Sequence, residues 1–152
     1  MKKLCFMLVA LLLSFAGFAK APAAAYGAYG LVVENHTNCT QTYIVVGDEI
    51  CMCGGAYAST MITIPPGGVH AYPNSTTIPG FPPVPKGIFG AKILDGPISC
   101  SPGGNAVGQA CGLLPSYGFM ALLSGCAPCA MTKATWIPAP NCQDIARLIF
   151  TP

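Results

Sequence analysis

Short apolar segments alternate with turn-forming residues along the chain from residue 31 onward. The clearest pattern lies in residues 88–95, where Phe89, Ala91 and Ile93 share one face and Lys92 points away. Such period-two alternation with one polar face is typical of a half-buried antiparallel strand. The same kind of pattern predicts further short strands at residues 31–35, 42–46, 61–64, 69–72, 131–137 and 145–150.

The final apolar segment fits two kinds of secondary structure. Ile145, Leu148 and Ile149 lie at the spacing of one helix face. Ala146, Leu148 and Phe150 alternate as they would in a strand. We favour the strand for residues 145–150, because a terminal strand would close the sheet.

About seven short strands without a long amphipathic helix predict an all-β fold, an antiparallel β-sandwich or Greek-key barrel. The proline-rich residues 73–85 cannot donate along a strand ladder, so we expect an extended crossing between sheets. Residues 100–125 are rich in glycine and are predicted to form a long loop held by its cysteines. Residues 31–152 have the length of a single cysteine-rich β domain.

The amino terminus carries the three parts of a secretory signal peptide. Two lysines precede an apolar run over residues 4–18, and small residues follow it. The run is shorter than the roughly 20 apolar residues of a membrane-spanning helix. We predict a signal peptide at 1–19 with cleavage after Ala19 or Ala21, a secreted or periplasmic protein, and no membrane span after cleavage. Residues 20–30 lack a regular period and are predicted to be a flexible leader.

Charge limits the partners of the mature chain. From residue 20 onward, five basic side chains balance five acidic ones and no basic patch forms. The electrostatic footprint of nucleic-acid binding is therefore missing. We expect an unknown protein or glycan partner at the cell envelope, met through neutral contacts.

Eight cysteines follow the predicted signal peptide, and an even number in an exported chain predicts a disulfide framework. The sequence does not choose among the many pairings of eight cysteines. The candidates are Cys39, Cys51, Cys53, Cys100, Cys111, Cys126, Cys129 and Cys142.

Two other uses of these cysteines remain open. Cys126 and Cys129 form a C-x-x-C with a proline inside, which resembles the redox pair of thiol-disulfide oxidoreductases. In those enzymes a helix follows the motif, whereas strand-like residues follow it here, so we favour loop cysteines. Cys51 and Cys53 could join this pair in a metal site, but their spacing and export favour disulfides. We predict no metal and no cofactor.

Catalytic groups are sparse. His36 and His70 belong to no recognisable motif. Asp48 and Glu49 are adjacent, and neighbours on a strand point to opposite faces, so they are poorly placed to share a substrate. We predict no catalytic residue.

Trp136 and three asparagines are the remaining candidates for ligand or modification sites. Trp136 could stack on a sugar, but it shares its strand face with Thr132, which favours core packing. Asn35, Asn38 and Asn74 match the N-glycosylation pattern, although we favour ordinary turn roles.

These observations favour a small exported binding or surface-structural domain without catalytic activity. One alternative is an envelope redox protein that uses Cys126 and Cys129. Another is a secreted inhibitor or toxin that presents residues 73–85, since stapled loops display recognition residues well.

Overall fold

The computed structural model describes residues 27–108 and 111–152, so the predicted signal peptide lies outside the described residues. Strands occupy about half of the described chain, with two single-turn 3-10 helices, η1 (Ser75–Thr77) and η2 (Ile98–Cys100). The strands are β1 (Gly30–Asn35), β2 (Gln41–Asp48), β3 (Tyr57–Ala58), β4 (Ile62–Ile64), β5 (Val69–Tyr72), β6 (Gly87–Leu94), β7 (Gly104–Gly108), β8 (Ser116–Leu122), β9 (Pro128–Ile137) and β10 (Ile145–Thr151).

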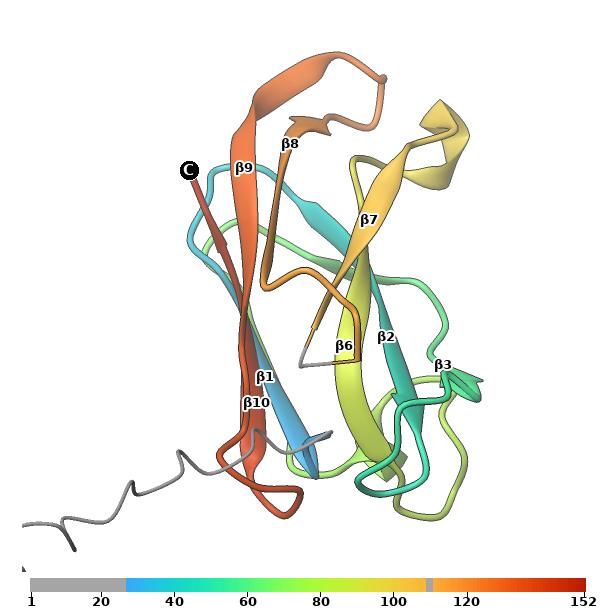
Figure 1. Ribbon diagram of the computed structural model, residues 1–152. Coiled ribbons are helices and arrows are strands. Elements are labelled where there is room, and N and C mark those ends of the chain that lie inside the picture. The colour runs from blue at the N-terminus through green and yellow to red at the C-terminus, as the bar shows by residue number, and fades with distance from the viewer. Residues whose placement is uncertain (1–26, 109–110) are drawn as a thin grey trace, which may run out of the picture.

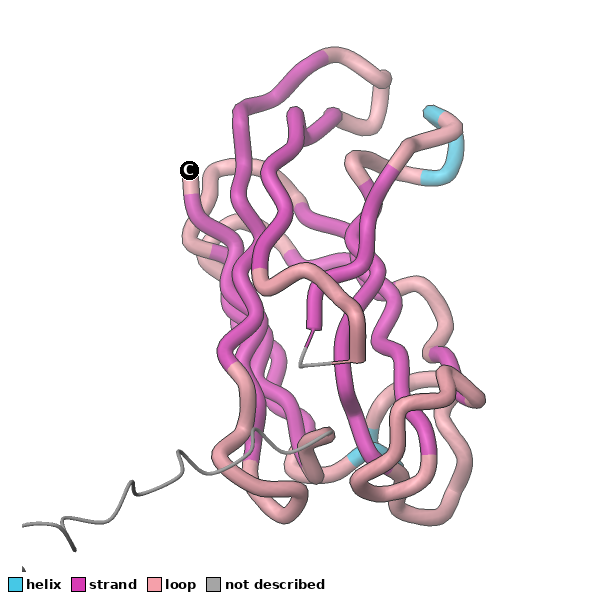
Figure 2. The backbone as a smooth tube through the Cα atoms, viewed as in Figure 1, coloured by secondary structure: helices cyan, strands magenta, loops and turns pink. Residues whose placement is uncertain are grey.

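The strands form two five-stranded sheets that face each other (Figure 1). The first has the order β5-β1-β10-β9-β8, and the second has the order β3-β2-β6-β7, with β4 also paired to β2. Figure 2 shows the two layers of strands joined by loops. The all-β prediction is confirmed in its sandwich form, and the sheets do not close into a barrel.

One strand pair departs from the expected antiparallel arrangement. β1 and β10 run parallel, with Leu31 opposite Ala146 and Asn35 opposite Phe150. The strand predicted at residues 145–150 is present, but it lies between β1 and β9 in the middle of its sheet. A parallel pair is possible here because the two strands lie far apart in sequence and need no tight turn between them.

The long loop predicted over residues 100–125 is wrong, because β7 and β8 lie within it. In β8, Phe119 and Ala121 are buried while Gly118 and Met120 are exposed, the alternation of a half-buried strand. β7 is short and rich in glycine, a residue with low strand propensity, so the sequence did not predict it as a strand. A Cβ atom at Gly108 would lie 2.4 Å from Leu113 Cδ1. The Leu113 side chain therefore fills the space that a side chain at Gly108 would need.

The last four residues of the predicted leader, 27–30, belong to the folded domain. Ala28 is fully buried and pairs with Ile88 through two backbone hydrogen bonds of 2.7 and 2.8 Å. Gly30 begins β1, and a Cβ atom there would lie 2.7 Å from the carbonyl oxygen of Tyr72. These small residues can therefore enter the sheet where larger ones would collide.

The core lies between the two sheets and confirms most of the predicted strand faces. On β9, Thr132, Ala134 and Trp136 are buried, as their alternation predicted. On β6 the pattern holds only in part, because the register with β2 shifts at a bulge. Phe89 is buried outside the intersheet core cluster, near Gly55, since the bulge displaces it from the face of Ala91.

The proline-rich segment at residues 73–85 leads from β5 in one sheet to β6 in the other, as expected. It is not extended throughout, because η1 interrupts it. Asn74 caps this turn by accepting a hydrogen bond from the backbone N–H of Thr76.

Candidate binding site

All eight cysteines of the predicted framework form disulfides. The pairs are Cys39–Cys129, Cys51–Cys142, Cys53–Cys111 and Cys100–Cys126. Three of them join loops or strands far apart in the sequence, with separations of 90, 91 and 58 residues. The disulfide prediction is confirmed, and the pairing comes from the structure alone.

The C-x-x-C motif does not form a disulfide of its own. Cys126 is bonded to Cys100, and Cys129 is bonded to Cys39. Strand β9 follows the motif, where an oxidoreductase would have a helix. This geometry does not support the redox alternative.

The structure also does not support the alternative in which four of the cysteines bind a metal. Cys51 and Cys53 are bonded to Cys142 and Cys111, away from the C-x-x-C motif. Within residues 27–108 and 111–152, no three His, Cys, Asp or Glu side chains gather as metal ligands would.

In the same described ranges, no helix has the length and apolar character that a membrane crossing requires.

A pocket of about 230 Å³ lies where the β8–β9 turn leans over the second sheet. Its polar side comes from Thr42 and Thr63 of the second sheet, from Thr40 just before β2, and from Ser124 of the turn. Its apolar side comes from Pro97, Leu122 and Leu123. Thr42 and Thr63 lie directly opposite each other in the β2–β4 pair, so strand register places their side chains on one face.

The hydroxyl groups around this pocket are available to a ligand. Within the described residues, the structure shows no side-chain hydrogen bond for Thr40, Thr42, Thr63 or Ser124. Thr42 is otherwise almost completely buried, with 4% of its surface exposed. A hydroxyl held this way can both donate and accept a hydrogen bond to a molecule in the pocket.

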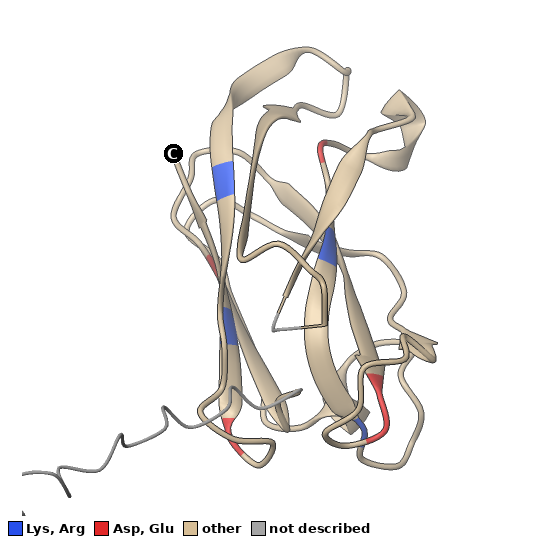
Figure 3. Ribbon diagram, viewed as in Figure 1, with Lys and Arg blue, Asp and Glu red and all other residues tan. Residues whose placement is uncertain are grey.

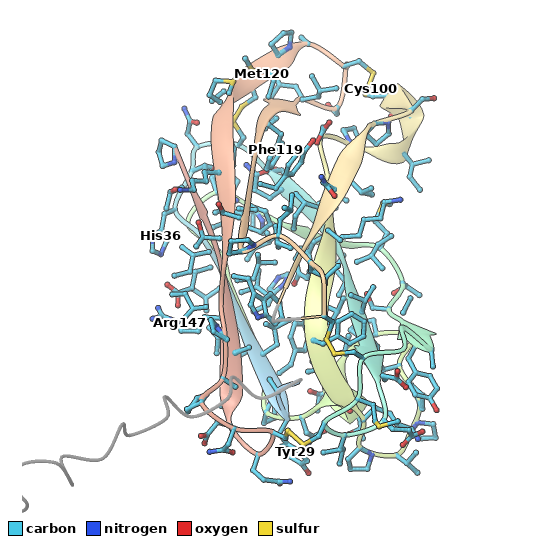
Figure 4. The ribbon with its side chains drawn as sticks, in the orientation of Figure 1. Tyr29, His36, Cys100, Phe119, Met120 and Arg147 are labelled. Atoms are coloured by element: carbon cyan, nitrogen blue, oxygen red, sulfur yellow. A yellow bond between two sulfur atoms is a disulfide. The ribbon has the colours of Figure 1, made fainter. Side chains whose placement is uncertain are left out.

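Two stapled loops form the rim above the pocket. The β8–β9 turn is closed by hydrogen bonds from the N–H of Leu123 to Ala127 and from that of Cys126 to Leu123, both 2.9 Å. Helix η2 is closed in the same way, from Cys100 to Pro97. The Cys100–Cys126 disulfide joins the two loops, and Figure 4 shows Cys100 at the same end of the molecule as Met120.

The end of the molecule with this pocket carries almost no charge (Figure 3). The sequence contains no Asp, Glu, Lys, Arg or His between Asp95 and Lys133. The Asp95 carboxylate accepts a hydrogen bond of 3.1 Å from the hydroxyl of Tyr117. Burial, and then this hydrogen bond, raise the pKa of Tyr117 above its ordinary value.

The histidines lie apart from this pocket. His70 on β5 is 2.8 Å from the hydroxyl of Tyr43 through Nδ1, and Tyr72 lies beside them. Burial lowers the pKa of His70 and raises the pKa of Tyr43. The contacts that the structure shows for His70 are with these tyrosines, an arrangement without the nucleophile of a catalytic triad.

His36 belongs to an exposed ion-pair group on the outer face of the first sheet. Its Nε2 lies 3.0 Å from Glu34, which also receives hydrogen bonds from Arg147. The hydrogen bond from Arg147 is the main reason that the pKa of Glu34 is lowered. Pairing across β1 and β10 accounts for this group, so it is structural in character.

At the opposite end of the sandwich, Asp48 and Glu49 do not act as a pair. Asp48 Oδ1 accepts the backbone N–H of Glu49 at 2.7 Å. Glu49 instead pairs with Lys86 and accepts the hydroxyl of Tyr57 at 2.8 Å. Hydrogen bonds from Lys86 and Tyr57 lower the pKa of Glu49. The carboxylate therefore stays ionised, and Lys86 balances its charge.

The remaining sequence candidates differ in exposure. Trp136 is 3% exposed, so its ring is not available for stacking on a sugar. Asn35 is fully buried, whereas Asn38 is exposed and Asn74 caps η1. Sequence reasoning missed the threonine pocket, because its residues come from four separate segments that only the fold brings together.

The fold and its cross-links define a disulfide-stapled β-sandwich domain with a neutral pocket at one end. Comparisons with protein-family models, with curated proteins and with solved structures find no match to this chain. Functional inference therefore depends on the pocket and on the surface around it.

Proposed function

We propose that this chain is an exported, non-catalytic binding domain whose pocket takes one unit of a neutral glycan. The observation that carries the proposal is the group of unpartnered hydroxyls from Thr40, Thr42, Thr63 and Ser124, facing an apolar wall. A sugar ring has the matching chemistry, with hydroxyl groups at its edge and C–H groups on its faces. No charged side chain lines the pocket, which favours a neutral ligand.

The size of the pocket supports a small ligand group. Sites for drug-sized molecules have volumes of roughly 300–1,000 Å³. At about 230 Å³, this pocket is smaller and open to the surface, as expected for the end or one side group of a longer chain. Four disulfides support export, because such bonds persist in oxidising compartments.

The test is a titration of neutral mono- and oligosaccharides into the mature protein, followed by the NMR signals of the Thr42 and Thr63 methyl groups. We expect one or more of these sugars to shift both signals at millimolar concentrations. Thr63→Val keeps the shape of the side chain and removes its hydroxyl. It should weaken that binding by about fivefold, the value of one hydrogen bond.

Thr135→Val is the matched control, because Thr135 lies on β9 in the other sheet, outside the pocket lining. It should bind the same sugar as tightly as the wild-type chain. If no neutral sugar moves the pocket signals, or if both valine variants bind equally, the proposed ligand class is wrong.

A further inference from the structure

The pocket end of the sandwich carries a second feature, a group of exposed apolar side chains that we call the apolar tip. Its members are Ile98, Met120, Leu123 and Met131, exposed by 64%, 41%, 48% and 61% respectively, and Leu123 is shared with the pocket wall. Met120 and Met131 lie directly opposite each other on β8 and β9. Ile98 belongs to η2, which the Cys100–Cys126 disulfide joins to the β8–β9 turn.

We propose that the apolar tip inserts into the interface of a lipid bilayer and holds the domain on a membrane surface. The first argument is charge, since the tip lies entirely within the stretch between Asp95 and Lys133, which contains no Asp, Glu, Lys, Arg or His. Moving an uncharged apolar loop from water into lipid avoids the desolvation cost that a charged side chain would impose. In Figure 3 the end of the molecule that carries the β8–β9 turn shows neither red nor blue on that turn.

The second argument concerns the backbone. In lipid, N–H and C=O groups need partners within the protein, because no water replaces them. The β8–β9 turn and η2 each close two such bonds internally, those of Leu123 and Cys126 in the turn and those of Cys100 and Ser101 in η2. The tip is therefore better prepared for an apolar medium than an open loop.

The third argument is the order of side chains along β9. Met131 and Lys133 point outward from the same face of the sheet, and Met131 lies nearer the β8–β9 turn. The two residues are two positions apart along the strand, so their Cα atoms lie about 6–7 Å from each other. Interfacial segments enter a bilayer by about 5–10 Å, so Lys133 would lie among the headgroups while Met131 contacts acyl chains.

A protein partner fits these observations less well. Protein interfaces carry about one hydrogen bond per 100–200 Å². The tip offers mainly thioether and aliphatic groups, and its loops use their backbone hydrogen bonds internally. The disulfide also fixes the two loops, so that insertion orders few additional torsions.

The test is co-sedimentation of the mature protein with neutral phosphatidylcholine vesicles. The wild-type chain should sediment with the vesicles, and binding should change little with salt because no net charge drives it. Ile98→Ser combined with Met131→Ser should lower the partition coefficient at least tenfold. Neither residue lines the threonine pocket, so sugar binding should persist in this variant.

Val69→Ser combined with Ile145→Ser is the control, because these side chains are exposed by 61% and 49% on strands away from the tip. This variant should bind vesicles as the wild-type chain does. The emission of Trp136 checks that each variant is folded.

Three outcomes would overturn the proposal. The first is a wild-type chain that stays in solution with neutral vesicles. The second is binding that needs anionic lipid and disappears in salt. The third is a self-association of the wild-type chain that Ile98→Ser and Met131→Ser abolish, which would make the tip a protein interface.

Discussion

Asn35 shows how one buried polar residue ties the two sheets together. It stands at the end of β1, yet its amide donates to the carbonyl oxygens of Cys39, Ile64 and Pro65 at 2.8, 3.2 and 3.0 Å. Its Oδ1 accepts the backbone N–H and the hydroxyl of Thr37. Because the Asn35 side chain is fully buried, its loss would remove several hydrogen bonds that water cannot readily replace, those to Cys39 and Ile64 among them.

Replacing Asn35 by alanine should therefore lower the free energy of unfolding by about 2–4 kcal/mol, a loss of several buried hydrogen bonds. Chemical denaturation followed by the fluorescence of Trp136 measures the change. Asn38→Ala is the control, since Asn38 is exposed, and it should cost less than about 0.5 kcal/mol. Equal losses in the two variants would show that Asn35 does not have this structural role.

At the scale of elements, the parallel pair of β1 and β10 is the unusual connection. Six residue pairs bring the first and last strands together, from Gly30 opposite Ile145 to Asn35 opposite Phe150. On the outer face of this pair, Arg147 Nε donates to Glu34 at 3.1 Å. The interaction joins elements that are far apart in sequence, so it helps to set which strands are neighbours.

Arg147→Gln should reveal this ion pair through its pH dependence. The pKa of Glu34 is lowered in the folded chain, so the pair stabilises the fold above the unfolded value of about 4.3. That contribution is lost as the pH falls through the lowered folded pKa. Because the pair is exposed to water, Arg147→Gln should cost less than about 1 kcal/mol at pH 7, and the difference should vanish in acid.

Thermal unfolding of both chains across pH 2–7 measures this effect. Lys133→Gln serves as the control, because it removes a cation from the same sheet face without breaking this pair. A wild-type advantage that persists unchanged in acid would contradict the assignment of the pH dependence to Glu34.

At the scale of the whole molecule, disulfides link the two sheets, and the charged groups with clear pKa shifts lie away from the neutral pocket. Cys39–Cys129 joins a residue before β2 to one in β9, so it links the two sheets. Cross-links that close loops of about 90 residues restrict the unfolded chain by about 4–5 kcal/mol each in the chain-entropy model. The charged groups with clear pKa shifts lie on the outer sheet face or at the opposite end, away from the neutral pocket.

The pairing of cysteines is directly testable on the purified protein. No thiol from Cys39 to Cys142 should react with an alkylating agent until a reductant is added, and eight should then react. Partial reduction with mass spectrometry should place Cys126 with Cys100 and Cys129 with Cys39. A direct link between Cys126 and Cys129 would contradict this framework and restore the redox alternative.

Local patterns in the sequence predicted the strands well where one face is buried. The alternation of Thr132, Ala134 and Trp136 found the core face of β9, because pleating makes neighbouring side chains point in opposite directions. The same logic failed at β7, whose glycines have no side chains to alternate. It also failed at Phe89, because a bulge depends on the neighbouring strand.

The sequence by itself determined the all-β class and the faces of most strands, because both follow from local periodicity. It also determined that eight cysteines lie between residues 39 and 142 and are available for disulfide bonds. Only the tertiary structure decided their pairing, the parallel contact of β1 with β10, and the pocket that unites Thr40, Thr63 and Leu122. These features join segments distant in the sequence, and their proximity is set by how the sheets pack, which no local pattern encodes.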